Sequence, residues 1–98
     1  MAKEDMKIEE RIQQLEENQL RMAREFGKQG VGFFLTLAGM RIAQLGPERY
    51  KDYEKYMLDS LNRANDEIGK AKSVDEAMNL ASKFTDDCIG YTETQLKK

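Results

Sequence analysis

The residues of this 98-residue chain that could do chemistry are few, and their spacing completes no familiar catalytic or metal site. Asp86 and Asp87 stand directly before Cys88, and all three side chains carry atoms that can bind a metal ion. Adjacent residues of a helix point in different directions, however, and the chain has no histidine and no second cysteine. The segment GKQGVG at residues 27–32 lacks the terminal Lys-Ser/Thr of a P-loop and the GxGxxG spacing. We therefore expect no catalytic residue, metal ion or cofactor, and a protein that is not an enzyme.

The cysteine and the tyrosines are explained more simply as parts of a helical core. Cys88 is the single cysteine, so it cannot form an internal disulfide, and it favours a reducing compartment and a buried apolar role. Tyr50, Tyr53 and Tyr56 recur at three-residue steps and could stack on a ligand. Tyrosines at a helix interface with their hydroxyls in solvent are the more ordinary arrangement.

Composition indicates one folded, helix-rich domain spanning residues 1–98. The chain is 35% charged and 40% hydrophobic and contains one proline. Its 16 basic and 18 acidic residues are interspersed, and no basic block could follow a phosphate backbone, so nucleic acid is not an expected partner. A chain this short has little interior of its own, and we therefore expect a homo-oligomer.

Neither export nor membrane insertion is expected from the sequence. The first residues, MAKEDMKIEERIQQ, are charged where a secretory signal needs an apolar core, which favours the cytoplasm. Residues 31–45 are the only plausible membrane span, but they are shorter than the roughly 20 residues that a spanning helix needs. They also contain Arg41, and we expect no transmembrane segment.

A heptad pattern predicts a helix over about residues 4–26 with an oligomerisation seam. The apolar members of the seam follow one another at alternating four- and three-residue steps and are Ile8, Ile12, Leu15, Met22 and Phe26. Gln19 fills the one polar position of the series. It either sets register and oligomeric state or is a tolerated, half-exposed site.

Three glycines at positions 27, 30 and 32 predict a break before a second helix at about residues 31–45, because each costs roughly 1 kcal/mol inside a helix. The alternative is one continuous helix from about 4 to 45 whose glycines let another helix approach closely. Residues 31–45 are too apolar for a single buried stripe, so they form either a central core helix or a surface that docks on something apolar. The candidate surface residues are Val31, Phe33, Phe34, Leu37 and Met40.

Two further helices are predicted at about 47–69 and 74–96. Gly46 and Pro47 are typical of a helix end followed by a helix start, and Ser73 with Glu76 forms a capping box for the last helix. The segments 4–26, 47–69 and 74–96 are each about 35 Å long and could lie side by side along their whole length. We predict an all-α fold, either an elongated antiparallel helical bundle or a coiled coil.

The stretch AKSVDEAMNLASKFTDDCIGY at residues 71–91 resembles the C-terminal segment of phasins, the helical proteins that coat polyhydroxyalkanoate granules in bacteria. The matching residues are Ala71, Lys72, Ser73, Glu76, Leu80 and Phe84. The resemblance implies a non-catalytic coat protein that binds an apolar polymer surface through helix faces and presents charge to the cytoplasm.

Two other functions explain the same residues without a granule. One is a self-assembling coiled-coil adaptor in which residues 31–45 are core, and the other is a chaperone-like module that shields a partner's helix. The adaptor predicts that Phe33 and Phe34 are inaccessible in the assembled protein. The coat protein requires at least one of them to be exposed, or to become exposed when the bundle opens.

Overall fold

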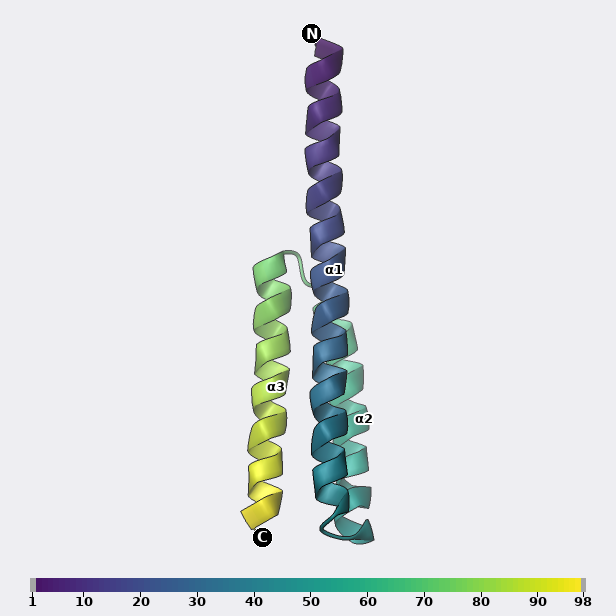
Figure 1. Cartoon of the computed structure of the whole chain (residues 1–98), viewed down its shortest axis with the longest axis vertical. Helices are drawn as coiled ribbons and strands as arrows, with labels where there is room; N and C mark the ends of the chain where they lie inside the picture. Colours follow the sequence, from purple (N-terminus) through teal and green to yellow (C-terminus); the bar gives the residue numbers. More distant parts are fainter. Residues whose placement is uncertain (1, 98) are drawn as a thin grey trace.

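The computed structural model describes the backbone of residues 2–97 and the side chains of residues 7–97, and it arranges this part of the chain in three helices. Helix α1 spans Ala2–Ala43, α2 spans Pro47–Gly69 and α3 spans Val74–Lys97. Helix α2 runs back along the lower part of α1, and α3 returns in the direction of α1 (Figure 1). The expected all-α, elongated antiparallel bundle is confirmed. None of these helices is long and apolar enough to cross a membrane.

Helix α1 continues through the glycines, so the expected break at residues 27–32 does not form and the continuous-helix alternative is correct. The reason is tertiary packing at Gly27. A Cβ atom on this residue would lie 3.1 Å from Cγ2 of Ile68 on α2 and 3.5 Å from Cβ of Ala81 on α3. The missing side chain lets both helices approach α1, and their packing outweighs the intrinsic helix penalty of glycine.

Only the second half of α1 belongs to the bundle. The Nε atom of Arg24 donates a hydrogen bond of 2.8 Å to the carbonyl of Ala71, in the turn between α2 and α3. This contact marks the level along α1 at which α2 ends and α3 begins. We call residues 24–43 the bundle half of α1 and residues 2–23 the projecting half (Figure 1). Most of the projecting half extends beyond the other helices, whereas Met22 and Ala23 at its end still lie beside α3.

The position of the projecting half corrects the expected side-by-side packing of residues 4–26 with the other helices. Segment 24–43 takes that place instead. Because α1 is unbroken and α2 starts directly after Gly46, the short connection places α2 beside the end of α1, along which it runs back (Figure 1). Gly46 has a φ of 128° and stands before Pro47, the first residue of α2, which confirms the predicted reversal.

The predicted cap of α3 is also present. The Oγ atom of Ser73 accepts a hydrogen bond of 3.1 Å from the N–H of Glu76. The carboxylate of Glu76 reaches back to accept a hydrogen bond of 3.0 Å from the N–H of Lys72, one residue before the serine. Both contacts occupy amides that helix formation would leave without an intrahelical partner.

The core lies between the three helices and combines one face of each. Its buried apolar members are Val31, Leu35, Ile42, Tyr53, Ala64, Ile68, Ala71, Ala77, Phe84 and Cys88. The hydroxyl of Tyr53 donates a hydrogen bond to the carbonyl of Leu35, which joins α2 to α1 inside the core. The expectation that tyrosine hydroxyls reach solvent is therefore wrong for Tyr53, whereas the buried apolar role expected for Cys88 is confirmed.

Candidate interaction surface

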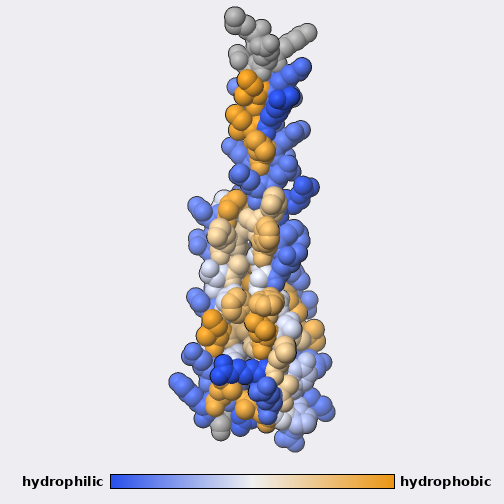
Figure 2. Space-filling model, in the orientation of Figure 1, coloured by the Kyte–Doolittle hydropathy of each residue, from blue (hydrophilic) through white to orange (hydrophobic). Residues whose placement is uncertain are grey.

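Helix α1 carries a second apolar face on the side opposite to the core. Because each residue of an α-helix turns the chain by about 100°, residues three and four apart share one face. The members of this face are each between 44% and 66% exposed, and together we call them the α1 stripe: Ile8, Ile12, Leu15, Met22, Phe26, Phe33, Leu37 and Met40. The buried residues Val31, Leu35 and Ile42 lie about half a helical turn away from it. Apolar surface on the projecting half continues over the bundle in Figure 2.

The heptad spacing of the stripe crosses the glycine segment without interruption. After Phe26, the same alternating steps lead through Gln29, Phe33 and Thr36 to Met40. Since α1 is continuous, the seam extends about 48 Å from Ile8 to Met40 at 1.5 Å per residue. It is therefore almost twice as long as the seam predicted for residues 4–26.

Three positions of the seam are polar, but one of them adds little polarity. The hydroxyl of Thr36 donates a hydrogen bond of 2.8 Å to the carbonyl of Gly32 in the preceding turn. Its hydrogen-bonding group is therefore occupied within α1, and its methyl group can contribute to apolar contact. Gln19 and Gln29 are exposed and interrupt the stripe with amide groups.

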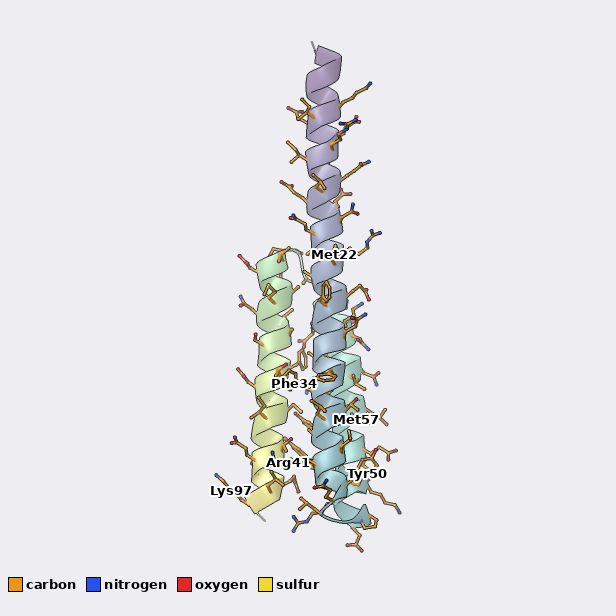
Figure 3. All side chains as sticks on the ribbon, viewed as in Figure 1. Met22, Phe34, Arg41, Tyr50, Met57 and Lys97 are labelled. Carbon is orange, nitrogen blue, oxygen red and sulfur yellow. The ribbon has the colours of Figure 1, made fainter. Side chains whose placement is uncertain are left out.

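An apolar groove of about 740 Å³ lies beside the stripe, between α1 and α3. The α1 wall includes Met22, Phe26 and Phe34, and the α3 wall includes Met78 and Ala81. Figure 3 shows Met22 at the level where α3 begins and Phe34 lower along α1. The walls expose large apolar side chains, since Phe34 is 43% and Met78 59% exposed. Stripe and groove form one continuous surface, because Met22 and Phe26 belong to both.

The structure places the residues of the predicted oligomerisation seam on one exposed face. It divides the predicted surface-binding residues into three groups. Phe33, Leu37 and Met40 lie on the stripe, Phe34 lies in the groove, and Val31 is only 1% exposed and faces the core. Residues 31–45 thus serve as a core helix on one side and as an exposed apolar surface on the other.

Sequence reasoning missed the contribution of α3 to this surface. None of the predicted surface residues lies on the last helix, whose apolar face carries Val74, Ala77, Met78 and Ala81. In the structure Ala77 is buried, whereas Met78 is 59% exposed and forms part of the groove. The width of this apolar face was the available signal, because it exceeds what packing against two helices requires.

Cys88 and the tyrosines, which could in principle do chemistry, are engaged in packing, whereas Asp86 and Asp87 are exposed. Cys88 is 2% exposed, and burial raises the pKa of its thiol, which disfavours a reactive thiolate. The rings of Tyr56 and Tyr91 stack at 4.0 Å, and the ring centroid of Tyr53 lies 5.9 Å from each. Within residues 7–97, no three cysteine or carboxylate side chains gather into a group that could hold a metal ion.

No family model matches the sequence, and no curated protein or solved structure matches it significantly. A function for the chain therefore has to be argued from its own surface. Among the described residues, the stripe and the groove together form an apolar surface that no other part of the chain covers.

Proposed function

We propose that this chain is a non-catalytic, self-assembling coiled-coil module whose contact surface is the α1 stripe. The observation that supports this proposal is the position of the stripe, opposite to the core and exposed along its length. A heptad seam on a helix is the pattern by which one helix packs against another through knobs-into-holes contacts.

The projecting half gives a second argument for a helical partner. Every described residue from 7 to 19 is exposed, so this part of α1 receives no cover from α2 or α3. An isolated helix of such length is only marginally stable in water, because helices gain most of their stability from packing an apolar face. Covering the half-exposed side chains at about 25 cal/mol per Å² would supply that stability.

The polar positions within the seam favour a helical partner over a smooth apolar surface. Gln19 and Gln29 lie among the stripe residues, and Glu9 and Glu16 flank it. An apolar polymer would remove water from these amides without offering hydrogen-bond partners, which is unfavourable. A partner helix can supply such partners, and polar seam positions then help to set register.

A phasin-like coat on polyhydroxyalkanoate granules is a second candidate, supported by the exposure of the residues that it needs. Phe33 is 61% and Met40 is 64% exposed, and Phe34 and Leu37 lie beside them. A chaperone-like module for another protein's helix would use the same surface. The coat and the self-assembling module differ in one respect, because assembly through the stripe would cover Phe33.

Sedimentation equilibrium over a range of concentrations tests self-assembly directly. We expect the wild type to sediment as a multimer of the 11.3 kDa chain and Leu15→Lys to shift toward the single-chain mass. Leu58→Lys is the matched control, because Leu58 is 53% exposed on α2 and lies outside the stripe. A single-chain mass for folded wild type at about 100 µM would contradict the proposal.

Partition of the protein between buffer and polyhydroxyalkanoate particles tests the coat. The comparison is wild type with Phe33→Ser/Phe34→Ser and with Leu58→Ser, using protein-coated particles as the control surface. Saturable binding that only the double variant loses, with its helicity retained, would support the coat. Absence of binding by well-folded wild type would remove this candidate and leave the self-assembling module.

A further inference from the structure

The two halves of α1 have nearly equal lengths. The contact between Arg24 and Ala71 divides this helix of 42 residues into residues 2–23 and residues 24–43. Each half is therefore about 30 Å long. The groove runs beside the upper part of the bundle half, where Phe26 and Phe34 contribute to its wall. A projecting half thus has the length needed to cover the bundle half of another copy.

The groove needs an occupant that no other helix covers, because it has walls on both α1 and α3. Residues 7–19 form such a helix, since each of them is exposed. In the register described below, residues 14–19 lie opposite the α1 wall of the groove and residues 7–13 continue along the stripe beyond it. The bundle half of a second copy is less suitable, because α2 and α3 already cover part of its circumference. Adding one projecting half to a bundle would produce a local four-helix arrangement.

The positions of the stripe residues match when two copies of α1 run in opposite directions. In an antiparallel coiled coil, the two alternating seam positions of one helix face each other across the pair. Centring the pair near Arg24 gives five matched layers: Met22 with Phe26, Leu15 with Phe33, Ile8 with Met40, Gln19 with Gln29, and Ile12 with Thr36. Three layers pair apolar side chains, the two glutamine amides can bond to each other, and Ile12 meets the threonine whose hydroxyl is already bonded within α1.

Gly30 provides independent support for a helix at this place. It lines the groove, and a Cβ atom built on it would have nothing within 4 Å. Gly27, by contrast, is explained by close contact with Ile68 inside the chain. Nothing within the described structure requires a glycine at position 30, whereas a helix lying in the groove would occupy the space beside it.

The contact would also be large enough for a specific dimer. Phe26 and Phe33 are 66% and 61% exposed, so each ring has roughly 100–160 Å² available for burial. These rings in both copies would together bury roughly 400–650 Å². The aliphatic stripe residues and the groove walls would raise the total above the roughly 1,000 Å² of a specific interface.

We infer that the partner of α1 is a second copy of this chain in antiparallel orientation, so that the projecting half of each copy lies in the groove between α1 and α3 of the other. The inference rests on the proposed self-assembly and specifies its stoichiometry and direction. Both copies use the same surface in this contact, which is therefore isologous and twofold symmetric, so the assembly closes at two chains. Glu25 of each copy then lies near the twofold axis. The Nζ atom of Lys28 in the same chain lies 3.6 Å from Oε1 of Glu25 and offsets the repulsion between the two Glu25 carboxylates.

Disulfide trapping distinguishes the two orientations. Cys88 is first replaced with alanine, and Leu15→Cys protein is then mixed with Phe33→Cys protein in a glutathione redox buffer. Antiparallel pairing places these positions in one layer, so covalent heterodimers should exceed either homodimer by at least about tenfold. In the same dimer the two copies of Leu15 would be about 27 Å apart, much farther than a disulfide can reach.

Two controls keep the experiment interpretable. Mixing Leu15→Cys with Leu58→Cys tests for random oxidation, since Leu58 lies on α2 outside the stripe, and it should show no such preference. Ile8→Cys with Met40→Cys provides a second pair in the same predicted register. Circular dichroism and sedimentation confirm that each variant folds and assembles before oxidation.

The outcomes separate this inference from the proposed function. Predominant Leu15 homodimers within a multimeric protein would establish parallel pairing, which overturns the antiparallel dimer and leaves self-assembly intact. A mass of three or more chains would likewise overturn the closed dimer alone. A single-chain mass at every concentration would overturn both proposals, and saturable binding to polymer particles by that monomer would then favour the coat.

Discussion

The ring of Tyr53 lies so close to Gly39 that a Cβ atom on the glycine would be 3.0 Å from Cε1 of the tyrosine. The same tyrosine donates a hydrogen bond to the carbonyl of Leu35, one turn earlier on α1. Its ring also packs against Tyr56 and Tyr91. Tyr53 is therefore held from several sides, and its position depends on the absence of a side chain at residue 39.

The Gly39→Ala substitution should lower the free energy of unfolding by about 1–3 kcal/mol, because the buried Tyr53 ring cannot move aside without losing its contacts. Gly90→Ala is the matched control on α3. A Cβ atom at position 90 would meet nothing within 4 Å, so alanine should stabilise the helix by about 0.5–1 kcal/mol. Urea unfolding followed by circular dichroism measures both effects. Equal stabilisation by the two substitutions would show that Tyr53 adapts freely.

Stability should decline at alkaline pH because buried acids resist losing their protons. Burial is the main cause that raises the pKa of Tyr53 and of Cys88 above their ordinary values of 10.0 and 9.0. Above these ordinary pKa values the unfolded chain releases the two protons while the folded chain keeps them. The two groups therefore make their full contribution to the free energy of unfolding below pH 9, and this contribution is lost as the pH rises further.

Unfolding free energies measured from pH 7 to pH 11 test this dependence. Tyr53→Phe should cost about 1 kcal/mol at neutral pH through loss of the hydrogen bond to Leu35. It should also flatten the alkaline decline, because one group that ionises in the unfolded state is absent. Cys88→Ala should flatten the decline as well, beginning at lower pH. A decline of unchanged steepness in both variants would locate its cause elsewhere in the protein.

The cap of α3 should make a measurable contribution to stability. Ser73→Ala removes the acceptor for the N–H of Glu76 and should lower the free energy of unfolding by about 1 kcal/mol. A loss of that size would reduce the melting temperature by about 4–8 °C. Asn79→Ala, an exposed polar-to-alanine change in the same helix, serves as the control. A similar loss in both variants would remove the capping explanation.

Local signals in the sequence predicted the features that depend on a few neighbouring residues. Gly46 with Pro47 predicted the reversal, and Ser73 with Glu76 predicted the start of α3. Heptad spacing likewise predicted that Ile8 to Phe26 share one face. These features arise from backbone geometry and helix periodicity, which act within one or two turns.

The features that sequence reasoning did not predict depend on which helix covers which face. Glycine propensity favoured a break at Gly27, but its contact with Ile68, far away in sequence, keeps α1 continuous. Val31 and Phe33 were assigned to the same surface, yet only Phe33 faces outward once α2 and α3 cover the other side. The groove could not be predicted either, because it needs α3 to lie beside α1.

Gly30→Ala should have opposite effects on the stability of the chain and on its self-association. In the monomer, alanine meets nothing within 4 Å and should stabilise α1 by about 0.5–1 kcal/mol. In the antiparallel dimer, the added methyl group would meet the projecting half of the partner. We expect the dimer dissociation constant to rise about tenfold, which corresponds to about 1.4 kcal/mol.

Sedimentation over a dilution series measures the dissociation constant, and urea unfolding at concentrations below it measures the stability of the monomer. Gly90→Ala is again the control, because it should stabilise its helix without changing association. A Cβ atom would meet nothing within 4 Å at either glycine, so the contrast between them separates the approach of a second helix from a general gain in helix propensity. If Gly30→Ala left the dissociation constant unchanged, no helix would approach residue 30, and the groove would not bind the projecting half of a second copy.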